Sequence, residues 1–373
     1  MLFTYRYVKH DIEKIQIWLD HLVRNVWCKA AGRFHVGLLD TRLREVVIAV
    51  ADDNRTKRKL FEPIRDLFDL FKNLSVNQRK QFSRWYDANN NIEALCSNSP
   101  KHQPVTYAEV AQINADLAEK LKGFYDDLWD RVLGLGPVES EIGTIDAHYK
   151  DFIRENNEGK CPYCGYGDIK GLQHSKREAY DHFLPKGAYP FNSVNFKNLA
   201  PMCHECNSSY KLKLDPIKHI DPITRKNTGV RRKAFYSYSP SSPGISIDIA
   251  FSNTDIENLT SSDITLTFTA PGREEEVDSW KDVFGIEERY KAKCCAKNDG
   301  KAWLQQIIEE CANPQVGLTS DDLLAQVIRA AERSPYDSAN FLKKPFLLAC
   351  KNAGLIRNSV TSAEMQASAV NRK

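Results

Sequence analysis

The fold of this chain depends on residues 160–211, which read K-C-P-Y-C at 160–164, Y-D-H-F-L-P-K at 180–186 and N-L-A-P-M-C-H-E-C-N-S-S-Y-K at 198–211. Four of the ten cysteines lie in this stretch, as two C-x2-C pairs. The other six show no regular spacing, and a chain of 373 residues does not need disulfides to be stable. We therefore expect reduced thiols rather than a disulfide framework.

The two cysteine pairs have the spacing of a tetrahedral metal site. Two thiolates separated by two residues can reach one ion, and two such pairs complete a four-thiolate zinc site without an open position, which indicates a structural role. Four unrelated buried thiols or a redox dithiol are the alternatives, and the redox dithiol is disfavoured because no βαβ pattern surrounds either pair. The predicted ligands of a structural Zn²⁺ are Cys161, Cys164, Cys203 and Cys206.

The distance between the two pairs is unusual for a zinc ribbon. Thirty-eight residues separate Cys164 from Cys203, whereas common ribbons use about 15–20. The additional residues contain the pair Asp181-His182, and Asn207 directly follows the second cysteine pair. An isolated Asp-His pair is usually a surface feature, but its position between two C-x2-C pairs favours a functional role.

These residues resemble the HNH endonucleases of the ββα-metal fold, in the subclass stapled by a four-cysteine zinc site. In that family an Asp-His pair on a first strand precedes an Asn that opens a second strand, and a short helix then carries a final Asn or His. The matching positions here, in the family's order and as an H-N-N variant, are Asp181-His182, Asn198 and Asn207. The resemblance covers about residues 160–215.

The resemblance implies phosphodiester hydrolysis with a role for each matching residue. His182 would be the general base, because a neutral imidazole can take a proton from water at pH 7. Asp181 and Asn207 would hold a catalytic Mg²⁺ or Mn²⁺ through hard oxygen ligands, and Asn198 would orient His182. Phosphate contacts are predicted for Lys211, Lys186 and Lys213. For His174 we expect a surface position rather than a supporting role, and His204 inside the second cysteine pair is redundant as a zinc ligand beside Cys203 and Cys206.

The predicted fold is mainly α, with a small central α+β insert formed by the ββα-metal module and its zinc site. The expected parts are an N-terminal helical domain (1–157), the HNH module with a basic connector (158–233), a C-terminal α+β region (234–357) and a flexible tail (358–373). Helical regions and a short antiparallel β-ribbon would flank the module.

Local patterns place the expected elements. Apolar alternation predicts that Ile245–Ile249 and Ile264–Phe268 pair as an antiparallel ribbon. His21, His35 and Trp129 are interpreted as core or surface residues rather than site residues. Helical periodicity, and a capping box at Thr106–Glu109, predict helices at about 11–30, 40–51, 57–73, 106–133, 274–296, 300–312, 320–333 and 338–354.

Charge and hydropathy indicate which partners and which cellular compartment to expect. The net charge is only +3, but residues 211–233 contain eight Lys/Arg against two acids, which could follow a phosphate backbone or form a solvated loop. The N-terminus has no apolar signal region, and no apolar run approaches the length of a membrane span. We therefore expect a cytoplasmic protein without membrane contact.

Three segments of the sequence suggest a biological role. D-H-F-L-P-K, C-x2-C-N and the segment from Trp280 to Tyr290 are similar to HNH effectors of bacterial anti-phage systems, including the Septu type that acts beside a separate ATPase. We expect DNA rather than RNA as the substrate, although the sequence does not distinguish them, and the resemblance implies a regulatory partner such as that ATPase. The alternatives are a zinc-stabilised nucleic-acid-binding or interaction module without catalysis, and a restriction or mobile-element endonuclease.

Overall fold

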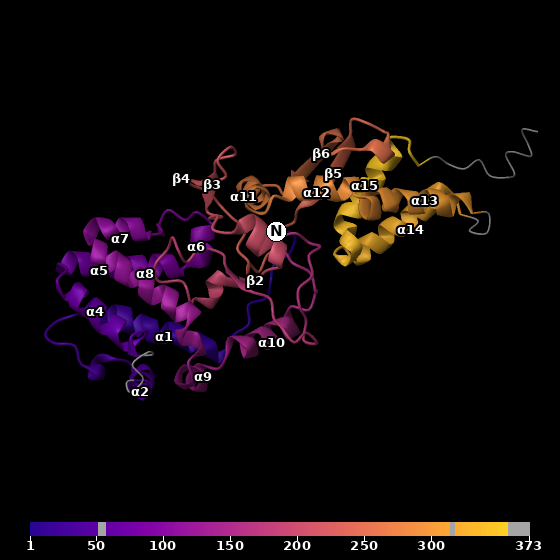
Figure 1. The fold of residues 1–373 in the computed structure, drawn as a ribbon. Helices are drawn as coiled ribbons and strands as arrows, with labels where there is room; N and C mark the ends of the chain where they lie inside the picture. Colours follow the sequence, from indigo (N-terminus) through magenta and orange to yellow (C-terminus); the bar gives the residue numbers. More distant parts are fainter. Residues whose placement is uncertain (51–56, 314–317, 357–373) are drawn as a thin grey trace, which may run out of the picture. The chain divides into compact units, whose positions relative to one another are not determined.

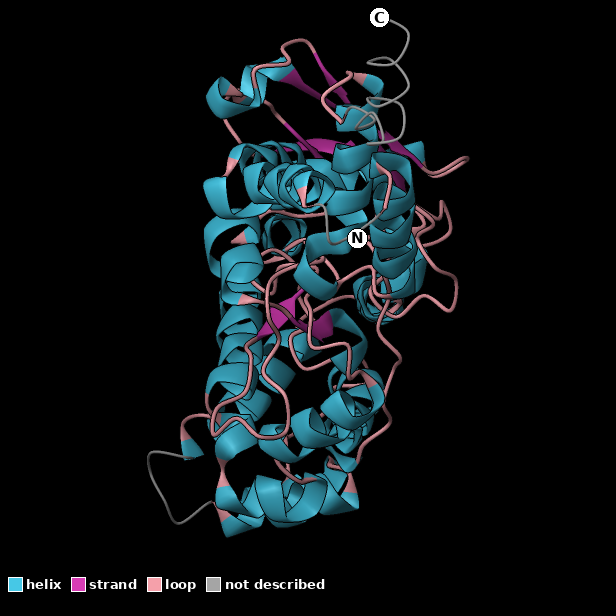
Figure 2. Cartoon of the chain, turned by 90° about the vertical axis from the view of Figure 1, so that its right-hand side faces the viewer, coloured by secondary structure: helices cyan, strands magenta, loops and turns pink. Residues whose placement is uncertain are grey.

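The structure, a computed structural model, describes residues 1–50, 57–313 and 318–356 (Figure 1). The predicted tail at 358–373 lies outside the described residues. Within them the chain is mainly helical with three two-stranded antiparallel sheets, which confirms the predicted mainly α class (Figure 2). None of the helices in the described ranges is long and apolar enough to cross a bilayer.

The chain forms two compact units. The larger one contains residues 4–162 and 168–242, and so holds the N-terminal helices together with most of the 160–211 stretch. The smaller one contains residues 1–3, 163–167 and the chain from 243 onward. The four-part division expected from the sequence stays a prediction.

Helices make up most of the larger unit. The expected helices near 11–30, 40–51 and 57–73 are present over their described residues, whereas the helices at 76–90, 92–96, 136–142 and 145–155 were not predicted individually. The bounds are α1 Lys14–His21 continued by a π-type segment Leu22–Trp27, α2 Thr41–Ala49, α4 Phe61–Lys72, α5 Val76–Asn90, α6 Ile92–Cys96, α7 Tyr107–Ile113, α8 Ala115–Asp130, α9 Gly136–Ile142 and α10 Ile145–Glu155.

The helix expected from the capping box is two helices. The box itself is present, because Thr106 Oγ1 accepts from the Glu109 amide at 3.3 Å and the Glu109 carboxylate accepts from the Thr106 amide at 2.8 Å. At Asn114 the backbone is extended (φ −159°, ψ 117°), and the side chain accepts from the Leu117 amide and so caps α8. The prediction of one continuous helix was wrong because a cap residue stands inside an uninterrupted apolar stripe.

Two small hairpins follow the helices in the larger unit. Strands β1 (Tyr180–His182) and β2 (Leu199–Pro201) pair antiparallel, with Asp181 opposite Ala200. A π-type helical turn, Glu205–Lys211, follows β2. The basic connector then forms a hairpin of β3 (Lys218–Ile220) and β4 (Asn227–Arg231), which the sequence analysis did not predict.

The smaller unit combines a ribbon with helices. Strands β5 (Ser246–Phe251) and β6 (Ile264–Thr269) pair antiparallel with Ile247 opposite Phe268, which confirms the predicted ribbon. The helix expected at 274–296 is divided at Gly285, which has a left-handed backbone (φ 58°) that glycine adopts without strain. The helices are α11 Glu274–Phe284, α12 Ile286–Cys295, α13 Ala302–Ala312, α14 Ser320–Arg333 and α15 Asn340–Asn352.

Candidate metal centre and active site

The four predicted zinc ligands lie together. The sulfur atoms of Cys161, Cys164, Cys203 and Cys206 are all within 4.8 Å of one another, and all four residues are buried. Thiolates at 2.3 Å around a tetrahedral zinc ion stand about 3.8 Å apart, so a small contraction of the cluster would complete the site. The donor set and its geometry therefore fit a structural zinc ion.

The first cysteine pair has the local backbone of a metal knuckle. The Gly167 amide donates to Cys164 Sγ at 3.3 Å, which supports the charge of a thiolate. Gly165 has a left-handed backbone (φ 80°), and a Cβ atom at this position would collide with Leu2 and Phe341. The sequence C-G-Y-G thus permits a turn that a larger residue at position 165 would block.

His182 is held in one tautomer. Its Nε2 lies 2.8 Å from the carbonyl oxygen of Ser193, and a carbonyl can only accept, so Nε2 carries the proton and Nδ1 keeps a lone pair. The Ser193 hydroxyl in turn donates to the Tyr125 carbonyl in α8 at 2.7 Å. Burial lowers the pKa of His182 to about 4, and the positive charges of Lys186 and Lys211 act in the same direction. The ring is therefore neutral at pH 7.

Trp129 of α8 covers the His182 ring. The two ring centroids are 4.9 Å apart with an interplanar angle of 81°, an edge-to-face contact. From the sequence we interpreted Trp129 as a core or surface residue, and its contact with His182, more than fifty positions away in the chain, was not foreseen. A signal was present in the spacing of Asp126, Trp129 and Asp130, which share one face of a helix.

Asp181 forms a buried ion pair with Lys211. The Lys211 Nζ lies 2.9 Å from Asp181 Oδ2 and 3.1 Å from Oδ1, and it also donates to the His182 carbonyl at 2.9 Å. Their exposed fractions are 6% for Asp181 and 1% for Lys211. Burial raises the pKa of Asp181, and Lys211 opposes this effect. The ammonium group predicted to contact phosphate therefore points at Asp181 in this structure.

The two oxygens of Asp181 are not equivalent. Oδ1 accepts a hydrogen bond from Lys211, whereas Oδ2 accepts none among the described residues despite its short distance to Nζ. The Lys211 ammonium group, 2.9 Å away, is nevertheless the cation that neutralises the charge of this buried carboxylate. Carboxylate and amide oxygens are the ligand types that Mg²⁺ or Mn²⁺ prefers, but an ion at Asp181 would have to displace the Lys211 ammonium group.

The two asparagines have different surroundings. Asn198 is buried and clamps the backbone just after β1, accepting from the Leu184 amide at 2.8 Å and donating to the Leu184 carbonyl at 3.0 Å. Asn207 is half-buried in the turn that follows Cys206, and its side chain makes no hydrogen bond to any described residue. The structure thus gives Asn198 a backbone-holding contact and leaves the Asn207 amide available.

The two other lysines predicted to contact phosphate, Lys186 and Lys213, differ in whether an acidic side chain already pairs with them. Lys186 pairs with Asp130 at 2.9 Å and with Asp126 at 3.3 Å, so α8 neutralises it. Lys213 is exposed, as are His204 and the histidine that we expected at the surface, His174. Lys213 therefore remains placed for a ligand, whereas Lys186 would have to leave its acidic partners.

His148 is a buried group near the site that the sequence analysis missed. It lies in α10, and its Nδ1 is hydrogen-bonded to the Tyr180 hydroxyl, one residue before Asp181. Burial lowers the pKa of His148 to about 4, and the nearby His10 adds to the effect. Its position on a helix face among apolar residues gives no functional signal in the sequence, because such a histidine is usually part of the core.

The described fold and site define a mainly helical protein that carries a buried four-cysteine cluster beside a short hairpin with an Asp-His pair. Over 68 residues the chain is 38% identical to the Septu protein PtuB of Bacillus thuringiensis. The matched segment is 17% of this chain and 25% of PtuB. Over 65 residues it is 40% identical to the protein ea31 of Escherichia phage lambda. This matched segment is 17% of this chain and 19% of ea31.

Both similarities are local, because the chain spans a quarter or less of each relative. No protein-family model and no solved structure matches the chain.

Proposed function

We propose that this protein is a metal-dependent HNH endonuclease that hydrolyses phosphodiester bonds in nucleic acid, with DNA as the substrate. The observation that carries the proposal is the state of His182, a neutral imidazole with Nε2–H fixed by the Ser193 carbonyl and Nδ1 unprotonated. This is the state that a general base for water activation requires. Asp181 precedes it on β1, and Asn198 holds the backbone that follows it.

The chain's own residues divide the hydrolysis between them. His182 Nδ1 takes the proton of the attacking water, while the Ser193 carbonyl stabilises the imidazolium that forms. Asp181 Oδ2 and the Asn207 amide oxygen would hold the divalent ion. The chemistry that Mg²⁺ or Mn²⁺ supplies when bound is charge neutralisation at the scissile phosphate and at the leaving 3′-oxygen. Asn198 keeps the loop after β1 in place during the reaction.

Zinc has a separate, structural role in this proposal. Four thiolates leave no open coordination position, so the zinc ion does no chemistry. Cys203 follows β2 by two residues and Asn207 follows Cys206 directly, so the cluster fixes both the hairpin and the turn that carries Asn207. A metal staple at this point replaces a hydrophobic core that so short a module does not build.

The local similarity to a Septu protein supports a narrower proposal, that the chain is the effector of an anti-phage defence system. A nuclease of this kind needs restraint, since unregulated cutting would damage its host. We therefore propose a protein partner such as a separate ATPase. The similarity to a phage-encoded protein favours a second candidate, a mobile-element endonuclease. The Lys211–Asp181 ion pair favours a third, a zinc-stabilised binding module without catalysis.

Plasmid incubation with Mg²⁺ or Mn²⁺ tests the proposed activity. We expect the wild-type protein to nick or linearise the plasmid, and His182→Ala and Asn207→Ala to lose activity by about 10²-fold or more. Lys80→Ala, an exposed lysine on α5, is the matched control and should keep full activity. Cleavage that survives in His182→Ala, or that no divalent ion supports in the wild type, would exclude the HNH mechanism.

A further inference from the structure

The hairpin formed by β3 and β4 carries an unusual surface. Ile223 near its tip is 89% exposed, and Val230 on β4 is 61% exposed. With Leu212, three of the eight exposed large hydrophobic residues in the described ranges fall within residues 212–230. Exposed apolar side chains that gather in one short segment indicate a contact surface, whereas single ones do not.

Positive charge accompanies these apolar residues. The exposed basic side chains of the segment are Lys213, His219, Arg225 and Lys226. The acid near the tip, Asp221, is engaged in the turn, where its Oδ1 accepts from the Ile223 amide at 3.1 Å, the Thr224 amide at 2.7 Å and the Thr224 hydroxyl at 2.9 Å. The tip therefore presents basic and apolar groups to a partner, and its one carboxylate is used internally.

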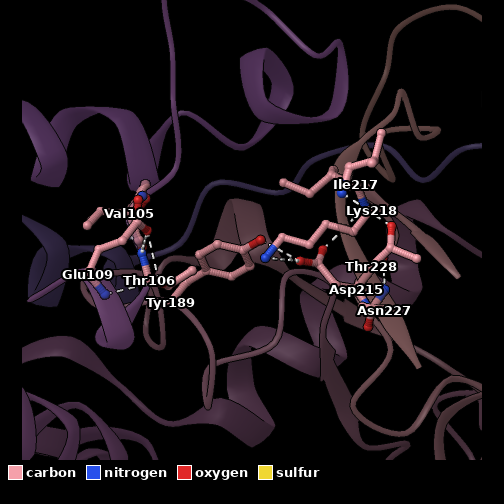
Figure 3. A network of polar contacts seen from close by, with 11 residues as sticks. Val105, Thr106, Glu109, Tyr189, Asp215, Ile217, Lys218, Asn227 and Thr228 are labelled. Atoms are coloured by element: carbon pink, nitrogen blue, oxygen red, sulfur yellow. Dashed lines mark hydrogen bonds and ion pairs between the residues drawn. The ribbon is translucent and has the colours of Figure 1, made fainter. Parts of the chain in front are cut away.

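The root of the hairpin is held firmly (Figure 3). The buried carboxylate of Asp215 accepts from the Tyr189 hydroxyl and lies 3.8 Å from the Lys218 ammonium group. The backbone of Asp215 and the side chain of Asn227 exchange two hydrogen bonds, of 2.8 and 2.9 Å. Figure 3 shows the Tyr189 hydroxyl and the Lys218 ammonium group beside each other, both directed at the Asp215 carboxylate.

The same network ties the hairpin to the active site. Tyr189 lies in the loop between β1 and β2, seven positions after His182. On the other side, Asp215 lies four positions after Lys211, which is paired with Asp181. Because both chain segments, from His182 to Tyr189 and from Lys211 to Asp215, are short, the hairpin has a fixed position relative to the proposed catalytic groups. A ligand bound along the hairpin would therefore meet the site in one register.

We propose that the β3–β4 hairpin enters a groove of duplex DNA and positions the scissile strand at His182; this inference deepens the proposed nuclease function and rests on it. A two-stranded ribbon fits the major groove of B-form DNA, which is about 12 Å wide. The three residues of β3, Lys218 to Ile220, rise roughly 10 Å, which is comparable with the groove's depth of about 8.5 Å. Lys226 and Arg225 contact phosphates, and Ile223 contacts apolar base edges such as a thymine methyl.

The observations favour duplex DNA over other partners. A-form RNA has a deep, narrow major groove that does not admit such a ribbon. An acidic protein could pair with the basic residues, but a single exposed isoleucine at the tip of a narrow ribbon offers it little apolar contact area. The shape and the positive charge of the hairpin together fit the groove of duplex DNA.

Binding in a non-cleaving background tests the inference. All variants are made in His182→Ala, and the probe is a fluorescent 20-base-pair DNA duplex measured by anisotropy at several salt concentrations. Lys226→Ala should weaken binding several-fold and lower the slope of log Kd against log salt by about 0.9, because one phosphate contact is lost. Ile223→Ser should weaken binding several-fold without changing that slope. Lys80→Ala should match the parent in both readouts.

The outcomes separate this inference from the nuclease proposal. Hairpin variants that bind like Lys80→Ala, or a parent that binds no duplex, overturn the hairpin inference. An RNA duplex of the same sequence that binds as tightly as DNA also overturns it. Because the assay needs no cleavage, a wild-type protein that binds DNA through the hairpin but never cuts plasmid would sink the nuclease proposal alone.

Discussion

The proton on His182 is placed by a single carbonyl oxygen. Ser193 accepts from Nε2, and its hydroxyl is anchored on the Tyr125 carbonyl, so the orientation of the imidazole depends on α8 as well as on the hairpin. Trp129 of α8 makes an edge-to-face contact with the same ring. The proposed general base is thus positioned by residues of α8 as well as by the 160–211 stretch.

Removal of the Trp129 ring should impair catalysis more than substrate binding. Trp129→Ala lets the imidazole rotate away from its reactive geometry, and we expect kcat for plasmid cleavage to fall about 10- to 100-fold with little change in KM. Trp129→Phe, which keeps an aromatic edge, should retain most of the activity. Thermal melts of both variants check that they are folded. A change confined to KM would show that Trp129 serves substrate binding instead.

His148 makes stability depend on pH. Its pKa is about 4 in the folded protein and 6.5 when exposed, so the unfolded chain binds a proton first as the pH falls. The contribution of this group is complete above pH 6.5 and is lost progressively towards pH 4, up to about 3 kcal/mol. Urea unfolding at pH 7 and pH 5 measures it.

His148→Gln keeps a hydrogen-bonding group for Tyr180 but does not titrate. It should therefore lose less stability than the wild type between these two pH values. An equal loss in the two proteins would show that other groups cause the acid sensitivity.

At the level of elements, the zinc knuckles are expected to hold the β1–β2 hairpin in place. Metal analysis should find one zinc ion per chain, and Cys203→Ser should lose it. A loss of roughly 4 kcal/mol would lower the melting temperature of the unit by about 10 °C. Cys28→Ser, a half-buried cysteine outside the cluster, is the control and should keep both zinc and stability. Zinc-free wild-type protein with an unchanged melting temperature would contradict the staple.

Local signals in the sequence were sufficient for several elements. The Thr106–Glu109 capping box, the alternation that forms the β5–β6 ribbon and the C-x2-C spacing are each encoded within a few residues, and each is present in the structure. The break at Asn114 was missed, although it is also local, because its apolar neighbours continue the helical period on both sides. A cap inside a continuous stripe cannot be distinguished from an exposed helical asparagine by periodicity.

Long-range contacts could not be predicted in the same way. The contact of Trp129 with His182 and the ion pair of Lys211 with Asp181 join residues that only the folded chain brings together. A lysine one helical turn after Asn207 is compatible with either an exposed phosphate contact or a buried pair. Burial decided between them, and burial of a charged residue has no signature in the sequence beyond its partner.

For the whole molecule, the N-terminal helices belong to the same compact unit as the β1–β2 hairpin. Asn89 of α5 donates to the Pro190 carbonyl at 2.9 Å, Ser193 is anchored on Tyr125 of α8, and the Tyr5 hydroxyl donates to the Pro201 carbonyl at 3.0 Å. An excised fragment of residues 158–242 would expose all of these groups. We expect it to remain largely unfolded with zinc present, as seen by circular dichroism and by poor dispersion of amide NMR signals.

The matched comparison is the fragment 4–242, which contains the complete larger unit and should fold. A fragment 158–242 that folds cooperatively and cuts DNA at the wild-type rate would show that the helices are only an attached domain. This result would also remove the reason for assigning Trp129 a positioning role.

The most direct test of the central claim is single-turnover cleavage of an end-labelled DNA duplex in Mn²⁺, with the product ends identified. The proposed mechanism predicts 5′-phosphate and 3′-hydroxyl ends, because the 3′-oxygen is the leaving group. It also predicts a rate at least 10²-fold lower in His182→Ala, with duplex binding unchanged. Equal rates in the two proteins, or products with 3′-phosphate ends, would contradict the assignment of His182 as the general base.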